Sequence, residues 1–170
     1  IFADDGALYN GIALLDGGRI VAVRYKHELP NYGTFDEKRI FTPGPLPEPV
    51  EFKGVKLGLP ICEDGWLQPV STHLAKQGAE ILISVNGSPY EIDKDDRRLE
   101  QVFAARVAET GLPLLFLNRV GGQDELVFDG RGHDQWRHRE QPESRARSAR
   151  RGGRERRREG PGGWGRGENL

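Results

Sequence analysis

The chain has 170 residues, and a chain of this length ordinarily forms one domain that is large enough to bury a core. A single cysteine excludes an internal disulfide framework and fits a reducing cytoplasm. No apolar run reaches the roughly 20 residues of a membrane helix, and no signal peptide opens the chain, so we expect a cytoplasmic protein without a membrane segment.

The near-neutral total charge averages two unlike regions. Residues 1–130 hold 13 Lys and Arg against 20 Asp and Glu, whereas residues 131–170 hold 12 against 6. The second region has too few apolar residues to offset the entropy of ordering it. We therefore expect a globular domain over 1–130 and an Arg- and Gly-rich disordered tail over 131–170.

The tail has three interpretations. It could bind nucleic-acid phosphates, it could be a solvated extension, or it could be a frameshifted translation of GC-rich coding sequence. All twelve of its basic residues are arginine, whereas residues 1–130 contain six lysines and seven arginines. This bias favours the frameshift and makes a nucleic-acid partner the weaker hypothesis.

The domain begins with apolar, β-prone runs. Residues 7–15 and 19–25 flank Asp16-Gly17-Gly18, whose glycines allow the positive φ of a tight turn, and this pattern predicts a hairpin. The proline-rich residues 42–49 predict a surface loop, because proline has no N–H for a ladder or a helix. The chain contains no methionine and opens on Ile1 without a capping or targeting signal, so we expect that it begins inside a longer reading frame.

Strands and helices alternate from residue 55 onward. Continuous apolar runs predict strands over 55–61, 80–85 and 112–117, and apolar side chains at three- and four-residue steps predict helices over 69–78 and 94–110. Asp93 is the expected N-cap of the second helix, and Gly111 is its expected stop. This alternation predicts an α/β domain in which helices pack on a sheet.

The only cysteine, Cys62, follows the first of these strands and directly precedes two acids, Glu63 and Asp64. A thiol at the end of a strand can be reached by a substrate and activated by its neighbours. A lone cysteine is also often a small buried hydrophobe. Residues 25–41, which are dense in functional side chains and turn residues, favour the nucleophile.

Three segments of the chain carry a family resemblance. They are Tyr25-Lys26-His27-Glu28-Leu29-Pro30-Asn31-Tyr32-Gly33 with Phe35-Asp36-Glu37-Lys38-Arg39, Pro60-Ile61-Cys62-Glu63-Asp64, and Asn118-Arg119-Val120-Gly121-Gly122-Gln123-Asp124-Glu125-Leu126-Val127-Phe128-Asp129-Gly130. Together they resemble the nitrilase-type amidase domain of glutamine-dependent NAD synthetases, a branch of the carbon–nitrogen hydrolase superfamily, over essentially all of residues 1–130. The resemblance implies a nitrilase-type α-β-β-α sandwich, incomplete here at both ends.

The resemblance implies a glutaminase whose ammonia is used, with ATP, to amidate nicotinic acid adenine dinucleotide. Cys62 would be the nucleophile that attacks the side-chain amide carbon of L-glutamine, and Lys26 would be the catalytic lysine. An ammonium beside a thiol favours the thiolate and can stabilise an oxyanion. Glu37 resembles the glutamate that positions this lysine, although it could equally be a surface carboxylate paired with Lys38 or Arg39.

Tyr32, Ser88 and Lys94 match positions at which the family contacts glutamine. The Tyr32 hydroxyl would hold a polar end of the substrate, and Lys94 would meet its α-carboxylate. Ser88 could instead be a simple turn residue, and Lys94 a solvated charge at a helix start. The sequence shows no spacing of metal ligands, so we expect no metal and no cofactor in this chain.

The resemblance also implies parts that we expect to lie outside the chain. These are the general-base glutamate, upstream of residue 1, and the synthetase domain with its ATP and magnesium. We therefore expect little or no glutaminase activity from the chain alone, and a homo-oligomer for the full-length enzyme. Two alternatives stay open: a stand-alone nitrilase-type amidase, which the segment Gly121-Gly122-Gln123-Asp124-Glu125-Leu126 disfavours, and a non-enzymatic nucleic-acid-binding protein acting through the tail.

Overall fold

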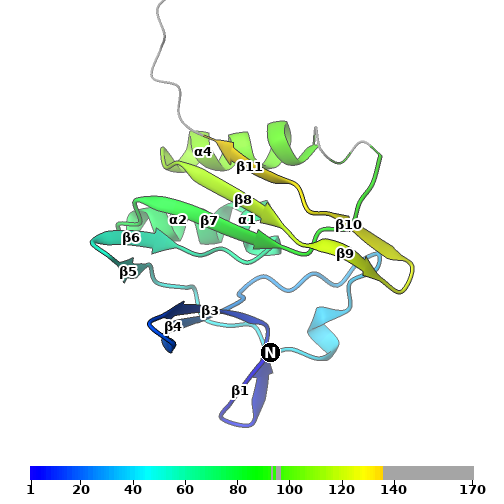
Figure 1. The fold of residues 1–170 in the computed structure, drawn as a ribbon, viewed down its shortest axis with the longest axis horizontal. Helices are drawn as coiled ribbons and strands as arrows, with labels where there is room; N and C mark the ends of the chain where they lie inside the picture. Colours follow the sequence, from blue (N-terminus) through cyan, green and yellow to red (C-terminus); the bar gives the residue numbers. More distant parts are fainter. Residues whose placement is uncertain (93, 95–96, 136–170) are drawn as a thin grey trace, which may run out of the picture. The chain divides into compact units, whose positions relative to one another are not determined.

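The computed structural model describes residues 1–92, 94 and 97–135, which belong to a unit that spans Ile1–Arg137. The interpretations of the tail over 136–170, and the N-cap expected at Asp93, lie outside these residues. The described residues form a mixed α/β fold, as the alternating sequence pattern predicted (Figure 1). Within this part of the chain, no helix is both long and apolar enough to cross a membrane.

Two antiparallel pairs make up the first 25 residues. β1 (Phe2–Asp4) pairs with β2 (Ala7–Tyr9), and β3 (Gly11–Asp16) pairs with β4 (Arg19–Tyr25). The second pair confirms the predicted hairpin, whose turn holds Gly17 and Gly18 at φ values of 56° and 74°. The single strand predicted over 7–15 is wrong, because the chain changes partner at Asn10, whose carbonyl accepts a hydrogen bond from the Lys26 N–H at 2.8 Å.

A five-stranded sheet has the order β11-β8-β7-β6-β5. Its central strands β6 (Val55–Gly58), β7 (Ile81–Asn86) and β8 (Leu114–Asn118) are parallel, and the edge strands β5 (Val50–Phe52) and β11 (Gly132–Gln135) are antiparallel to their neighbours. β6 ends before the predicted residue 61 because Pro60 has no N–H to donate, yet Ile61 still forms a parallel bridge with Val85. β9 (Val120–Gln123) and β10 (Leu126–Asp129) form a separate hairpin after β8.

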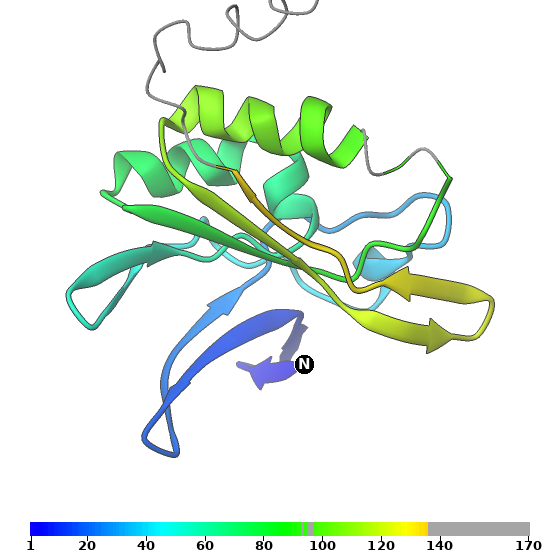
Figure 2. The same cartoon turned by 45° about the horizontal axis from the view of Figure 1, so that its top comes forward.

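Helices cover one face of this sheet, and the β3–β4 hairpin lies on the opposite side (Figure 2). α2 (Gln68–Lys76) matches the first predicted helix. The described part of the second contains a π-helical segment, η2 (Arg97–Phe103), and α4 (Ala104–Thr110), which stops as predicted where Gly111 adopts a φ of 71°. Two short helices, η1 (Glu37–Arg39) and α1 (Glu63–Trp66), had no predicted counterpart.

The hydrophobic core lies between the helices and the sheet. Its buried side chains come from α2, η2, α4, β7, β8 and the turn between α2 and β7: Val70, Leu74, Ala79, Leu82, Val102, Phe103, Val107, Leu114 and Phe116. The rings of Phe103 and Phe116 lie 4.4 Å apart between centroids and join η2 to β8. This packing fixes the ends of β7 and β8, where the polar residues of the candidate site gather.

β11 extends the sheet past Gly130, the residue at which composition places the end of the domain. Its backbone pairs with β8, from Gly132 opposite Leu117 to Gln135 opposite Leu114. The four residues of β11 include no apolar side chain, so composition could not separate this edge strand from the tail. The expected boundary between 130 and 131 therefore falls between β10 and β11.

Candidate active site

Cys62 lies in a sharp turn between the sheet and α1. Its backbone adopts φ 49° and ψ −105°, a conformation that residues other than glycine rarely take. The Cys62 N–H donates to the Val85 carbonyl at 3.0 Å, and the Cys62 carbonyl accepts from the Gly65 N–H at 2.8 Å. Strain of this kind persists only where the surrounding bonds enforce it, and it concentrates at functional sites. We call residues 60–65 the elbow.

Lys26 and Glu37 form a buried ion pair beside the elbow. The Lys26 Nζ donates to both carboxylate oxygens of Glu37, at 2.8 and 2.9 Å, and Lys26 is only 1% exposed. Asn10 Nδ2 donates to the same carboxylate at 3.4 Å. Of the two interpretations of Glu37, the structure shows the pair with Lys26, while Arg39 pairs with Asp36. The catalytic roles of Lys26 and Glu37 stay predictions.

The thiol of Cys62 is affected by several groups at once. Burial raises its pKa, whereas the Lys26 ammonium and the backbone N–H of Gly87 lower it, and the carboxylates of Glu63 and Glu37 raise it again. The net effect is a raised pKa, because desolvation outweighs the ammonium. Lys26 therefore opposes the cost of forming the thiolate without removing it, and the thiol needs a base to react.

Two cavities meet at Cys62. The larger has a volume of about 590 Å³ and is lined by Cys62 with Tyr32, Ser88 and Lys94. The smaller has a volume of about 290 Å³ and is lined by Cys62 with Lys26 and Glu37. The structure thus brings all the site residues predicted from the sequence into the two cavities around one thiol.

Charged side chains of both signs line the larger cavity. The Tyr32 hydroxyl donates to the Glu63 carboxylate at 2.8 and 2.9 Å, and Lys94 Nζ donates to Glu91 Oε1 at 2.7 Å. Partial burial and the bond to Glu63 raise the pKa of Tyr32. Lys94 is 8% exposed and lies 6.0 Å from the Trp66 ring centroid, so it is not the solvated charge of the alternative interpretation. A cavity of this composition suits a small zwitterion.

Ser88 is held by a polar network that the sequence analysis missed. Its N–H donates to Asn118 Oδ1 at 2.9 Å, and its carbonyl accepts from Arg98 Nη2 and Asn118 Nδ2, both at 3.0 Å. Arg98 Nη1 also pairs with Asp129 Oδ2 at 2.7 Å, and Asn118 donates to Asp129 at 2.8 Å. Ser88 is therefore held at the cavity wall by η2 and β8 directly, and by β10 through Asp129.

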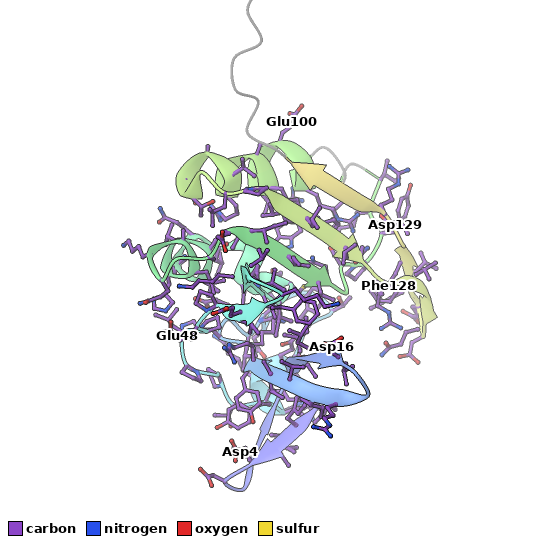
Figure 3. All side chains as sticks on the ribbon, turned by 60° about the vertical axis from the view of Figure 1, so that its left-hand side comes forward. Asp4, Asp16, Glu48, Glu100, Phe128 and Asp129 are labelled. Carbon is purple, nitrogen blue, oxygen red and sulfur yellow. The ribbon has the colours of Figure 1, made fainter. Side chains whose placement is uncertain are left out.

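Asp129, labelled in Figure 3 at the end of β10, is the anion of this network. Burial raises its pKa, but the hydrogen bonds from Arg98, Asn118 and the Arg131 N–H outweigh burial and lower the pKa to about 2. The sequence did contain a signal for Arg98, because this residue lies four positions before the apolar Val102 and is therefore a charge on the buried face of a predicted helix.

Asp64 is the second residue that the sequence analysis left without a role. It is fully buried, and its Oδ1 accepts hydrogen bonds from the backbone N–H groups of His27 and Glu28, at 3.2 and 2.8 Å. Its Oδ2 accepts from the Ile61 N–H at 3.1 Å. Burial raises the pKa of Asp64 to about 6, although these bonds and the Lys26 charge oppose the rise. The available signal was a pair of acids, Glu63 and Asp64, directly after the nucleophile at the end of an apolar run.

A family model for carbon-nitrogen hydrolases matches residues 2–139. The chain belongs to the carbon–nitrogen hydrolase family. The family match covers the elbow, both cavities and every site residue named above, and it includes β11. It confirms the nitrilase-type α/β fold expected from the three sequence segments.

Individual relatives indicate which branch of the carbon–nitrogen hydrolases the chain resembles. The glutamine-dependent NAD(+) synthetase of Rhodobacter capsulatus is 50% identical over 129 residues, which are 76% of this chain and 23% of that protein. The structure of the glutamine-dependent NAD+ synthetase of Acinetobacter baumannii with ADP has a TM-score of 0.73 at 36% identity, over 79% of this chain and 25% of that one. This chain therefore spans about a quarter of the length of these relatives. The matches confirm its resemblance to glutamine-dependent NAD synthetases.

A solved amidase adds chemical information. The amidase from Nesterenkonia sp. AN1 has a TM-score of 0.55 at 26% identity, over 69% of this chain and 44% of that one. One structure of a mutant of that amidase shows acrylamide joined by Michael addition to its active-site cysteine. A carbon–nitrogen hydrolase of this fold thus presents a cysteine that a small electrophile can reach.

Proposed function

We propose that this carbon–nitrogen hydrolase domain cleaves the side-chain amide of L-glutamine and that Cys62 is its nucleophile. The observation that carries the proposal is the position of Cys62, in a strained elbow where a cavity lined by charges of both signs meets the buried Lys26–Glu37 pair. A glutamine bound in the larger cavity would place its amide at the thiol. Its two charged groups would then lie against the charged side chains of the wall.

The walls of the larger cavity supply complementary groups for an amino acid. Lys94, one of whose hydrogen atoms is used by Glu91, would meet the α-carboxylate. Glu63, which already accepts from the Tyr32 hydroxyl, would accept from the α-ammonium. Ser88, held at the cavity wall by its backbone, would offer its hydroxyl to the substrate.

The chemistry follows from the groups around Cys62. Sγ gives its proton to a general base and bonds to the amide carbon, and the carbonyl electron pair moves to the oxygen, where the Lys26 ammonium and the Glu63 N–H would stabilise it. Collapse of this intermediate breaks the C–N bond, and the nitrogen takes the proton back from that base and leaves as ammonia. Water then cleaves the thioester to give glutamate and the free thiol. Glu37 would hold the Lys26 side chain in place, and the general base would be the further glutamate that the family resemblance implies.

The wider role of the reaction is part of the same proposal. Ammonia from this site would serve the ATP-dependent amidation of deamido-NAD in a synthetase domain, and ATP and magnesium would bind in that domain. Within residues 1–92, 94 and 97–135, no three His, Cys, Asp or Glu side chains are grouped so as to hold a metal ion. The proposal assigns only the cleavage of the glutamine amide to these residues. The cytoplasmic location and the homo-oligomer stay predictions.

Covalent labelling of the full chain tests the proposal without requiring turnover. A chloromethyl ketone analogue of glutamine should alkylate Cys62 at least about tenfold faster than chloroacetone, which carries the same electrophile without the amino-acid part. Intact-mass spectrometry follows the added mass, and Cys62 is the only thiol in the chain. Lys94→Gln should slow labelling by the analogue and leave labelling by chloroacetone unchanged.

Protection experiments separate the alternatives. L-glutamine should protect Cys62 from the analogue, whereas propionamide should not. Better protection by propionamide would favour the stand-alone amidase. Labelling by the analogue at the rate of chloroacetone, with no protection by glutamine, would show that the larger cavity does not bind glutamine.

A further inference from the structure

The most deeply buried acid near the site, Asp64, has no step in the proposed chemistry. It is 0% exposed, and both of its oxygens accept hydrogen bonds from backbone N–H groups. Ionised carboxylates are costly to bury, so such a group normally serves the structure or the function around it.

The partners of Asp64 lie next to the two central residues of the site. The His27 and Glu28 N–H groups directly follow Lys26 along the chain, and the Ile61 N–H directly precedes Cys62. One carboxylate therefore ties the segment that carries the ammonium to the segment that carries the thiol. The two segments are more than 30 residues apart in sequence.

The sheets do not make this connection. The β3–β4 hairpin, which leads into Lys26, is a two-stranded sheet of its own, and no strand described in the structure pairs it with the five-stranded sheet that leads to the elbow. The Lys26 backbone bonds to Asn10 and Gly44, both outside the elbow. The Asp64 bonds thus link the two layers where the ammonium and the thiol meet.

We propose that Asp64 is a positioning residue that fixes the Lys26 ammonium relative to the Cys62 thiol and thereby sets how readily the thiol ionises. The inference rests on the proposed function only for the reaction that the thiol performs. The three hydrogen bonds that Asp64 accepts, which we call the clamp, do not depend on glutamine. Three donors require two accepting oxygens, and asparagine offers one oxygen and an NH₂ that would face another N–H donor. Of these two side chains, only the carboxylate can accept all three hydrogen bonds.

The rate of Cys62 alkylation by iodoacetamide, measured across pH on the full chain, tests the clamp. Loss of a negative charge through space would lower the thiol pKa and speed alkylation of Asp64→Asn, because the thiolate is the reactive form. Loss of the clamp would weaken the influence of Lys26 and do the opposite. We expect Asp64→Asn to raise the thiol pKa by about one unit and slow alkylation near pH 8 by about tenfold.

A matched control is available in Glu80, whose carboxylate also accepts a backbone N–H bond, from Lys56 at 2.8 Å. Glu80→Gln should leave the thiol pKa unchanged. A double-mutant cycle then separates positioning from a general loss of structure: Asp64→Asn should add little to the slowing already caused by Lys26→Met. If Asp64→Asn does not fold, Asp64→Glu, which keeps the charge but lengthens the side chain, takes its place in the same cycle.

Two results would overturn the proposal. One is alkylation of the Asp64 variant at or above the unsubstituted rate with an unchanged or lowered thiol pKa. The other is a full Asp64 effect in the Lys26→Met background. Both are independent of glutamine, so failure of the clamp and failure of the glutaminase proposal give separate signals.

Discussion

Asp64, which is buried, and Asp129, which is partly buried, are two carboxylates that hold different segments of the same site by different means. Asp64 accepts backbone N–H bonds and leaves the nearby Lys26 ammonium paired with Glu37 beside the thiol. Asp129 is bonded directly to the Arg98 guanidinium, which also holds Ser88. The pKa of Asp64 is raised to about 6, and that of Asp129 is lowered to about 2. Asp64 thus leaves the cation of its segment beside the thiol, whereas the cation next to Ser88 is bonded directly to Asp129.

The largest effect on stability is expected from removing Arg98, which holds Ser88 at the cavity wall. Arg98→Met removes the cation that is paired with Asp129 and one of the two side-chain donors to the Ser88 carbonyl, and breaking a buried ion pair costs about 3–5 kcal/mol. Urea denaturation of the full chain measures this loss. Arg39→Met, which removes the exposed pair with Asp36, is the control and should cost less than about 1 kcal/mol. Equal losses in the two variants would refute the structural role of Arg98.

The pH dependence of stability should have opposite signs at the two carboxylates. The folded pKa of Asp64 lies above its ordinary 3.8, so its contribution to the free energy of unfolding falls as pH rises from about 4 to 6, by about 3 kcal/mol. The folded pKa of Asp129 lies below 3.8, so its contribution is present above about pH 4 and is lost as pH falls toward 2.

Chemical denaturation between pH 2 and 7 checks these signs. Asp64→Asn should remove the fall between pH 4 and 6, and Asp129→Asn should flatten the rise between pH 2 and 4. A profile of Asp64→Asn that matches the unsubstituted chain between pH 4 and 6 would show that this carboxylate does not titrate there.

A smaller effect is expected at the thiol itself. Lys26→Met removes the ammonium that lowers the Cys62 pKa, so alkylation by iodoacetamide near pH 8 should slow by about tenfold. Arg98→Met should leave this rate within about twofold, because Arg98 acts on Ser88 rather than on the elbow. A slowed thiol in the Arg98 variant would mean that the two regions are coupled.

The smallest effect is expected from the side chain of Ser88. Because the backbone of Ser88 carries the network bonds, Ser88→Ala should leave stability within about 0.5 kcal/mol and slow labelling by the glutamine analogue only several-fold. Thermal unfolding and the labelling rate measure the two parts. A strongly destabilised Ser88→Ala chain would show that its hydroxyl has a structural role.

Local pattern predicted most of the fold. The turn glycines Gly17 and Gly18, the stop at Gly111 and the apolar runs of β7 and β8 each act over a few residues, and all appear in the structure. β11 could not be predicted from composition, because an edge strand held by backbone bonds needs no apolar residue.

The candidate site residues could be predicted from the sequence, but the groups that hold them in place could not. Motif resemblance identified Cys62, Lys26, Glu37, Tyr32, Ser88 and Lys94, which the structure places around two adjoining cavities. Asp64 and Arg98 act on backbone groups of segments distant in sequence, and such partners become visible only when the chain is folded. The raised pKa of Cys62 likewise depends on burial, which could not be predicted from the presence of Lys26 in the motif.

The central claim is that Cys62 is a nucleophile and that the larger cavity beside it binds L-glutamine. The most direct measurement is the rate at which the chloromethyl ketone analogue labels Cys62 in the full chain, with L-glutamine or D-glutamine as competitor. We predict that labelling becomes slower as the concentration of L-glutamine rises, following the occupancy of one competing site, and that D-glutamine has little effect. Equal effects of the two enantiomers, or none from either, would contradict the claim.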